Sequence, residues 1–307
     1  MSKQLTDTIL MVRPESFSFN EETARANVFQ SEKNVDGLVL KRALAEFDSF
    51  VETLRSNDVN VLILKYDSSL KLPDAVFPNN WFVTYEDGTV VLFPMLAVNR
   101  RNERNPEQLL KLFSESGLMI KNLVDISDHE KENLFLEGTG SLVLDRKNKI
   151  VYAIESERTS KEMFEEYCDM MNIKEANRIF FHANDKDGKP IYHTDVMLSV
   201  GDGFAVICDE CISKEERNFV LKKLSESNLE AIKINYEQLY SFCGNILNVK
   251  NKKGESIIVM SAKAFNNFTS QQIKTLERYG RIIHSDISTI ENVGGGSTRC
   301  MMAEIFL

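Results

Sequence analysis

Cys300 is the residue of this chain best suited to nucleophilic chemistry, because it ends a glycine-rich run that starts at Gly294. Glycines let the backbone approach a ligand closely and can direct N–H groups at developing charge. A lone cysteine is usually a small buried hydrophobic residue, so a nucleophilic role also requires a nearby positive group that lowers the thiol pKa. We therefore expect Cys300 to be a nucleophile with a lowered pKa.

His193 is the best candidate for the acid/base partner of this thiol. Asp195 follows two residues later, and in a strand the two side chains would share one face, where the carboxylate can fix the protonation of the imidazole. The alternative is a structural histidine. The other three histidines, His129, His182 and His284, lie in polar segments typical of the surface or of strand ends.

Two carboxylates lie at expected strand starts, beside residues that leave them room. Glu137 precedes Gly-Thr-Gly, and Asp74 follows a proline. Each can accept hydrogen bonds from a planar N–H donor such as a guanidinium, unless it caps a turn instead. Asn79 and Asn80 precede the sole tryptophan, Trp81, which indicates a pocket wall or, equally, a core tryptophan.

These residues recur at corresponding places of an internal repeat. Each unit has a polar segment, a short apolar strand, a turn rich in Asp, Gly, Asn or Lys, and a second apolar strand, as a hairpin requires. The corresponding polar positions lie 52 to 63 residues apart. They are Asp74, Glu137, His193, Asn245 and Cys300. Five modules around an axis would bring them to one centre; the alternative is chance spacing in an ordinary α/β domain.

Helix-like stretches separate the hairpins, so each unit is a mixed βα module. They span residues 38–55, 106–116, 160–171, 214–227 and 270–279. The fifth unit, 294–307, lacks a hairpin partner, and we expect residues 8–12 to supply it. The two termini would then close a ring with pseudo-fivefold symmetry, and residues 1–307 would form one catalytic domain.

Composition excludes several classes of protein. The chain has 307 residues, 43% of them hydrophobic, and a net charge of -9, which disfavours nucleic-acid binding. Its apolar runs are far shorter than the roughly 20 residues of a membrane span, and its N-terminus does not resemble a secretory signal. We expect a cytoplasmic protein that binds neither nucleic acid nor membrane.

The five cysteines do not form a disulfide framework, because their number is odd and they are spread along the chain. Cys208 and Cys211 form a C-x-x-C motif, which can bind zinc or exchange disulfides. The motif has no second pair and no nearby histidine, and Cys208 ends an expected strand. Packing in the core is therefore favoured over a zinc or redox site.

Together these segments resemble the amidinotransferase and dimethylarginine dimethylaminohydrolase group of the guanidine-modifying (pentein) superfamily, which includes arginine deiminase. The resemblance is closest to the citrulline-utilisation hydrolase type. It rests on Met11 to Pro14, Phe19 to Thr23, Val76 to Phe82 and Gly294 to Cys300. It covers nearly the whole chain and implies a five-module α/β propeller, in agreement with the repeat.

The resemblance also implies a role for each candidate residue. Cys300 looks like the nucleophile and His193 like the acid/base. Glu137 matches the carboxylate that orients His193 and the substrate nitrogens, and Asp74 and Asp195 match substrate-binding acids. No metal or organic cofactor is implied.

Two departures from the family pattern bear on the substrate. Asn80 replaces a guanidinium-binding Asp, and because an amide also donates hydrogen bonds, a neutral ureido group becomes a credible substrate. With neighbouring Asn79, it is an expected substrate contact. Phe93 stands where a carboxylate-binding Arg is found in the dimethylarginine enzymes. The substrate carboxylate is thereby left with four candidates: Arg13, Arg100, Arg101 and Arg104.

We therefore expect a hydrolase that attacks the guanidino or ureido carbon of an arginine- or citrulline-like small molecule through a covalent cysteine intermediate. If an amine replaced water as the acceptor, the same intermediate would make an amidinotransferase. A third reading is a non-catalytic binding protein on the same propeller, as in ribosome-associated members of the superfamily. The sequence leaves open whether the protein is a homo-oligomer.

Overall fold

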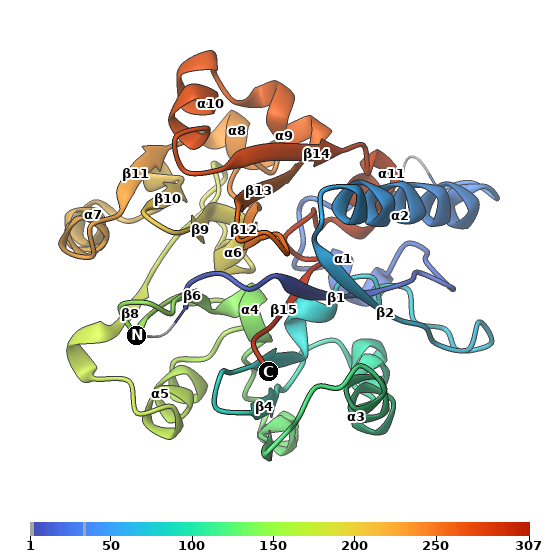
Figure 1. Ribbon diagram of the computed structural model, residues 1–307. Coiled ribbons are helices and arrows are strands. Elements are labelled where there is room, and N and C mark those ends of the chain that lie inside the picture. The colour runs from blue at the N-terminus through green and yellow to red at the C-terminus, as the bar shows by residue number, and fades with distance from the viewer. Residues whose placement is uncertain (1–2, 33–34) are drawn as a thin grey trace.

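The computed structural model describes residues 3–32 and 35–307, which contain five three-stranded sheets (Figure 1). In each sheet the middle strand pairs antiparallel with one neighbour and parallel with the other. The sheets are β15 (Ala303–Ile305), β1 (Thr8–Val12) and β2 (Asn60–Leu64); β3 (Phe82–Thr84), β4 (Thr89–Leu92) and β5 (Asn122–Asp125); β6 (Val143–Asp145), β7 (Ile150–Ile154) and β8 (Arg178–Phe181); β9 (Leu198–Val200), β10 (Phe204–Ile207) and β11 (Glu230–Lys233); and β12 (Leu247–Lys250), β13 (Ser256–Ser261) and β14 (Arg281–Ser285).

The connections explain this pairing. Four antiparallel pairs are hairpins, and each turn has a residue at positive φ: Gly88, Lys149, Gly203 or Gly254. A parallel strand requires a crossover, which is helical here. The crossover helices are α2 (Val39–Ser56), α3 (Pro106–Glu115), α5 (Lys161–Met170), α7 (Lys214–Glu226), and the pair α9 (Ala262–Asn267) and α10 (Ser270–Leu276). These helices confirm the five stretches expected from the sequence.

Helix α2 shows how the crossovers are held in place. Its apolar side chains recur at helical spacing and are buried, among them Ala43, Phe47, Phe50 and Leu54. Burying a large apolar side chain contributes roughly 1.5–3 kcal/mol, so this stripe fixes the helix against its sheet. Figure 1 shows α2, α3, α5, α7 and α10 at the periphery of the molecule.

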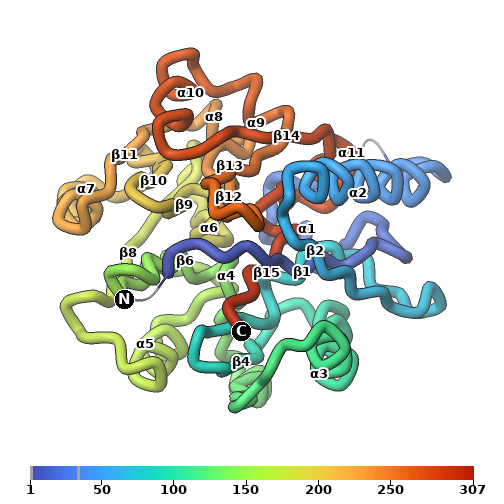
Figure 2. The backbone as a smooth tube through the Cα atoms, in the orientation of Figure 1, coloured from blue at the N-terminus to red at the C-terminus, as the bar shows by residue number. Residues whose placement is uncertain are grey.

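The two ends of the chain meet in one sheet, as the sequence predicts. β1 pairs in parallel with β2 and antiparallel with β15, with Thr8 opposite Ile305. Figure 2 shows the blue N-terminal segment crossing the red C-terminal one. Thr8–Val12 therefore supplies the strand that the fifth repeat lacks.

Short helical turns precede the inner strands, and here the expected strand boundaries are wrong. Residues Pro78–Asn80 form a 3₁₀ helix, and α4 (Gly138–Ser141) and α6 (Thr194–Met197) come directly before β6 and β9. His193 is thus the N-cap of α6 and Asp195 lies within it, so the two do not share a strand face. The local turn overrides the apolar alternation because α4 packs against both α6 and Pro78–Asn80.

The remaining short helices and 3₁₀ helices lie in the connections. They are α1 (Glu21–Ala24), α8 (Tyr236–Tyr240), α11 (Ser288–Gly294), and the 3₁₀ helices Val98–Glu103, Ser127–Glu132, Glu175–Asn177 and Asp209–Cys211. No helix among residues 3–32 and 35–307 is long and apolar enough to cross a membrane.

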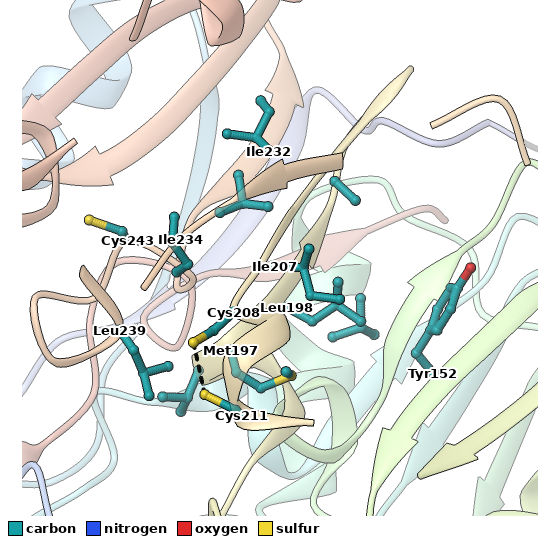
Figure 3. Close-up of a cluster of buried hydrophobic side chains, with 14 of the residues drawn as sticks. Tyr152, Met197, Leu198, Ile207, Cys208, Cys211, Ile232, Ile234, Leu239 and Cys243 are labelled. Carbon is teal, nitrogen blue, oxygen red and sulfur yellow. Dashed lines mark hydrogen bonds between the residues drawn. The ribbon is translucent and has the colours of Figure 1, made fainter. Parts of the chain in front are cut away.

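The C-x-x-C cysteines lie in the hydrophobic core, as expected. The Sγ atoms of Cys208 and Cys211 are 2.8 Å apart, and both residues pack in the cluster that contains Met197 and Leu239 (Figure 3). Trp81 is also fully buried, with its ring 4.6 Å from that of Phe82, so it is a core residue. Within the described part of the chain, no three His, Cys, Asp or Glu side chains are grouped so that they could hold a metal ion.

Candidate active site

Glu137 and His193 form a fully buried pair at the start of α4 and α6. His193 Nε2 lies 2.8 Å from Glu137 Oε2. Burial alone would raise the pKa of Glu137, but the charges of Arg158 and His193 and the hydrogen bond from His193 together lower it to about 2. An ionised carboxylate only accepts hydrogen bonds, so Nε2 donates and Nδ1 is the nitrogen that can exchange a proton.

Arg158 completes this pair, although nothing in the sequence singled it out. Its Nη1 is 3.5 Å from Glu137 Oε2, and its guanidinium lies 5.0 Å from the centre of the Tyr192 ring. Its Nη2 donates to the carbonyl of Thr23, while its buried Nε has no hydrogen-bond partner among the described residues. Arg158 lies in the loop after β7, roughly 20 residues beyond Glu137, where no periodic pattern marks it.

Cys300 lies next to Asn245 and Asp195, which come from two other modules. Asn245 Nδ2 donates to Cys300 Sγ at 3.2 Å, and Sγ is 3.5 Å from Asp195 Oδ2. Burial raises the pKa of the Cys300 thiol and the charge of Asp195 raises it further, while the Ser297 backbone and Asn245 oppose the rise. The expectation of a lowered pKa is therefore wrong, because burial and the neighbouring Asp195 both raise the pKa of this thiol.

The glycine run before Cys300 is packed against protein. A Cβ added at Gly294 or Gly296 would lie 2.8 Å from the ring of Phe77. Gly295 has φ +68 and accepts hydrogen bonds at its carbonyl from Asn27 and Tyr192. These glycines thus admit an aromatic ring and close loop contacts, which positions Cys300 but differs from the expected approach of backbone to a ligand.

Asp195 and Asn79 lie together beside the thiol. Asn79 Nδ2 donates to Asp195 Oδ2 at 3.1 Å, and Asn245 Nδ2 donates to the Asp195 carbonyl. Burial raises the pKa of Asp195, against the opposing charges of His193 and Arg299. Oδ1 of Asp195 is buried and unpartnered within residues 3–32 and 35–307.

Asp74 is held by the N-terminal segment. Its Oδ2 accepts hydrogen bonds from Asn20 Nδ2 at 2.7 Å and Thr23 Oγ1 at 3.0 Å, and lies 3.9 Å from Arg100 Nε. Burial raises its pKa, and Arg100 opposes the rise. Oδ1 has no partner in the described structure. Asp74 and Asp195 therefore each have one buried carboxylate oxygen without a hydrogen-bond partner among the described residues.

Asn80 is connected to a second buried arginine. Arg100 Nη1 donates to Asn80 Oδ1 at 2.7 Å, and Asn80 Nδ2 donates to Asn79 Oδ1 at 3.1 Å. A Cβ at Gly140 would lie 2.5 Å from Asn80 Nδ2 and 2.8 Å from His193 Nδ1. The Asn80 amide and the His193 ring therefore border the same small space, which only glycine leaves open.

The other residues weighed from the sequence lie elsewhere. Arg13 pairs with Asp48 and Glu15, and Arg101 and Arg104 pair with Glu130. Phe93 is in the core, where its ring is 5.8 Å from that of Tyr167. The other three histidines are exposed or bonded to surface carboxylates: His129, His182 and His284.

Comparison with protein families assigns the chain. The profile of the family described as "N,N dimethylarginine dimethylhydrolase, eukaryotic" matches residues 13–307. The chain belongs to this family. Membership confirms the resemblance to the dimethylarginine dimethylaminohydrolase group that the sequence motifs indicated. Comparison with functionally curated proteins gives no match.

Solved structures show the same fold at low sequence identity. The N-terminal domain of a substrate-bound mutant of ArgZ, an arginine dihydrolase from the ornithine-ammonia cycle in Cyanobacteria, matches with a TM-score of 0.74 and 17% identity over 98% of this chain and 99% of that domain. The chain spans 40% of full-length ArgZ. A dimethylarginine dimethylaminohydrolase, as an adduct with S-methyl-L-thiocitrulline, matches with a TM-score of 0.63 and 17% identity over 99% of this chain and 100% of that one.

The raised pKa of Cys300 leads to a prediction about its reactivity. Because burial and Asp195 keep the thiol protonated, the rate of alkylation by iodoacetamide should increase about tenfold per pH unit and should still be increasing at pH 9. Mass spectrometry of the Cys300 peptide measures this rate, with the buried Cys243 peptide as an internal control. A plateau below pH 8 would show that the free enzyme already holds a thiolate.

Proposed function

We propose that this protein is a cysteine-dependent hydrolase that attacks the guanidino or ureido carbon of an arginine- or citrulline-like small molecule. The observation that carries the proposal is the convergence of the Glu137–His193 pair and Cys300 from three modules of a chain in this family. Asp195 is 3.5 Å from Cys300 Sγ, and its carboxyl group interacts with the charge of His193, two residues before it. A mass-spectrometric screen of guanidino and ureido compounds for turnover tests it directly.

The reaction begins when the Cys300 thiol gives its proton to His193 Nδ1 and the sulfur attacks the planar carbon to form a tetrahedral adduct. His193 Nδ1 donates a proton to the departing amine, and the C–N bond breaks to leave a thiouronium or carbamoyl thioester on sulfur. Water, deprotonated by His193, then attacks the same carbon and releases the product and the thiol. Glu137 holds the ring orientation and stabilises the imidazolium that forms.

The substrate nitrogens would be held by the two carboxylate oxygens that lack partners. Oδ1 of Asp195 lies on the residue that contacts the nucleophile, and Oδ1 of Asp74 lies on a carboxyl group that interacts with the charges of Arg100 and Arg158. A ligand with N–H groups at both positions would remove the cost of leaving these atoms unsatisfied. Asn79 and Asn80 complete the polar wall.

Arg158 is the proposed contact for the substrate carboxylate. Its buried Nε lacks a partner in the part of the chain that the structure describes, whereas Arg101 and Arg104 are paired with Glu130. Arg100 is excluded because its donors are used by Glu103, Asn80 and a backbone carbonyl. A guanidinium can bind a carboxylate through two parallel hydrogen bonds.

We further propose that the five sheets form a closed five-module propeller, a single domain in residues 1–307. The pairing of β1 with β15 and the contacts of β15 with β3, β6 with β9 and β9 with β12 support this arrangement. The proposed ligands are small molecules and not nucleic acids, and the proposed location is the cytoplasm.

Cys300→Ser should abolish turnover and leave the fold intact. A serine hydroxyl is far less ionised than a thiol in the same site, so the first covalent step would fail. Steady-state rates and the Tm of both proteins measure the two effects. A serine variant that keeps most of the activity would show that catalysis is not covalent through Cys300.

His193→Ala should impair both proton transfers, and a lost general acid–base typically costs roughly 100- to 10,000-fold in rate. Glu137→Gln keeps a hydrogen bond to the ring but removes the charge, so it should have a smaller effect. The measurement is kcat for all three proteins under saturating substrate. A loss below about tenfold in the alanine variant would remove His193 from the acid/base role.

Asn80→Asp should shift the substrate preference toward the guanidinium. The wild type should process a citrulline-like compound better than an arginine-like one if Asn80 donates to a ureido oxygen, whereas a carboxylate would favour the cation and repel that oxygen. The measurement is kcat/KM for both compounds in both proteins. A ratio that does not change would refute a ureido preference set by Asn80 and leave Cys300 and His193 unaffected.

A further inference from the structure

We propose that Arg100 is a positioning residue that sets substrate specificity, because it fixes the direction of a buried hydrogen-bond chain from Arg100 through Asn80 and Asn79 to Asp195. Arg100 would thereby present the Asn80 amide to the substrate as a donor and Asp195 Oδ1 as an acceptor. This inference rests on the proposed function and names the substrate group that the site matches.

Arg100 sets the donor-to-acceptor direction of this hydrogen-bond chain. A guanidinium has five N–H donors and no acceptor, so the atom of Asn80 that faces Nη1 at 2.7 Å must be the oxygen. Without such a partner, an asparagine amide could rotate by half a turn and exchange its donor and acceptor. Arg100 therefore holds the Asn80 oxygen on its own side and leaves the Asn80 N–H group to face the site.

Arg100 is held in this position by groups on all sides. Its Nε and Nη2 donate to the Glu103 carboxylate at 2.9 to 3.2 Å, and Nη2 also donates to the Phe77 carbonyl at 3.2 Å. Arg100 is 2% exposed and Glu103 is fully buried. A bidentate arginine–carboxylate pair has a specific geometry, so the donor that reaches Asn80 cannot turn away at low cost.

The next two hydrogen bonds extend this direction to Asp195, the residue that contacts Cys300. Asn80 Nδ2 donates to Asn79 Oδ1 at 3.1 Å, which leaves Asn79 Nδ2 to donate to Asp195 Oδ2 at 3.1 Å. Asp195 favours the same direction, but burial raises its pKa and a protonated carboxyl can also donate, so only the donor-only guanidinium of Arg100 excludes the reverse direction. Oδ2 of Asp195 is thus occupied, and Oδ1 is the oxygen left for a ligand.

The polarity of the chain matches a ureido group better than a guanidinium. A ureido group has a carbonyl oxygen that accepts from Asn80 and an NH₂ that donates to Asp195. A guanidinium has only N–H donors, so one of them would face the Asn80 N–H with no acceptor between them. Leaving a buried donor unpaired costs enough to lower relative affinity by about tenfold or more.

The test compares two variants that differ only in the group facing Asn80. Glu103→Gln is the control: it removes the carboxylate and keeps the donor-only guanidinium. The test variant combines Arg100→Gln with Glu103→Gln, because a glutamine can both donate and accept and no longer fixes Asn80. The measurement is the ratio of kcat/KM for citrulline to that for arginine, because a loss of structure alone lowers both values together.

We expect the ratio to stay within about threefold of wild type in the control and to fall by about tenfold or more in the double variant. Equal ratios in wild type and double variant, or an equal fall in the control, would overturn the proposal. If the double variant does not fold, Arg100→Met with Glu103→Met makes the same comparison, since buried ion pairs are often replaceable by apolar residues of similar volume.

A wild type that processes neither compound would overturn the proposed function and not the hydrogen-bond chain itself. Neutron diffraction of the deuterated protein then tests the direction of the hydrogen bonds, because it locates the deuterons of both amides. We expect deuterons on the Asn80 atom that faces Asn79 and on the Asn79 atom that faces Asp195. Deuterons on the Asn80 atom that faces Arg100 would overturn the assignment.

Discussion

The free-energy cost of burying charged side chains is the main constraint on the structure at the centre of this protein. Taking an ionised side chain out of water costs several kcal/mol unless it is paired and hydrogen bonded. Four carboxylates and two guanidiniums are nevertheless almost completely buried there: Asp74, Glu103, Glu137, Asp195, Arg100 and Arg158. The surrounding loops and helical turns are arranged so that each charge finds a partner or keeps a site for one.

The two arginines are shared unequally among the four carboxylates. Arg158 and His193 keep Glu137 ionised, with a pKa of about 2 against the opposing effect of burial. Burial raises the pKa of Glu103 to about 7 even though it contacts Arg100. Burial also raises the pKa of Asp74 and of Asp195, so both carboxyl groups hold a proton more readily than a carboxyl group in water. Burial likewise raises the pKa of the Cys300 thiol, and the charge of Asp195 raises it further.

The helical turns before the inner strands give this centre its geometry. Two of these turns fix the position of a candidate site residue: Glu137 is the N-cap of α4, and His193 is the N-cap of α6. The turns pack against one another, while the sheets and crossover helices behind them form the hydrophobic core. Groups fixed on such rigid supports need little rearrangement during a reaction, which is how preorganised sites stabilise developing charge.

The sequence by itself determined the repeat, the five crossover helices and the pairing of the two termini, because strand and helix periods and turn residues are local signals. It also predicted Cys300, His193 and Glu137 as site residues from their corresponding positions in the repeat. It misplaced the strand starts, since the turns at Pro78–Asn80, α4 and α6 are stabilised by contacts between modules. Only the tertiary structure decided the place of Arg158, the raised pKa of Cys300 and the orientation of Asn80. Each of these depends on a group far away in sequence, as when Arg100 fixes the amide of Asn80, and hydrogen-bond direction and local charge leave no periodic trace along the chain.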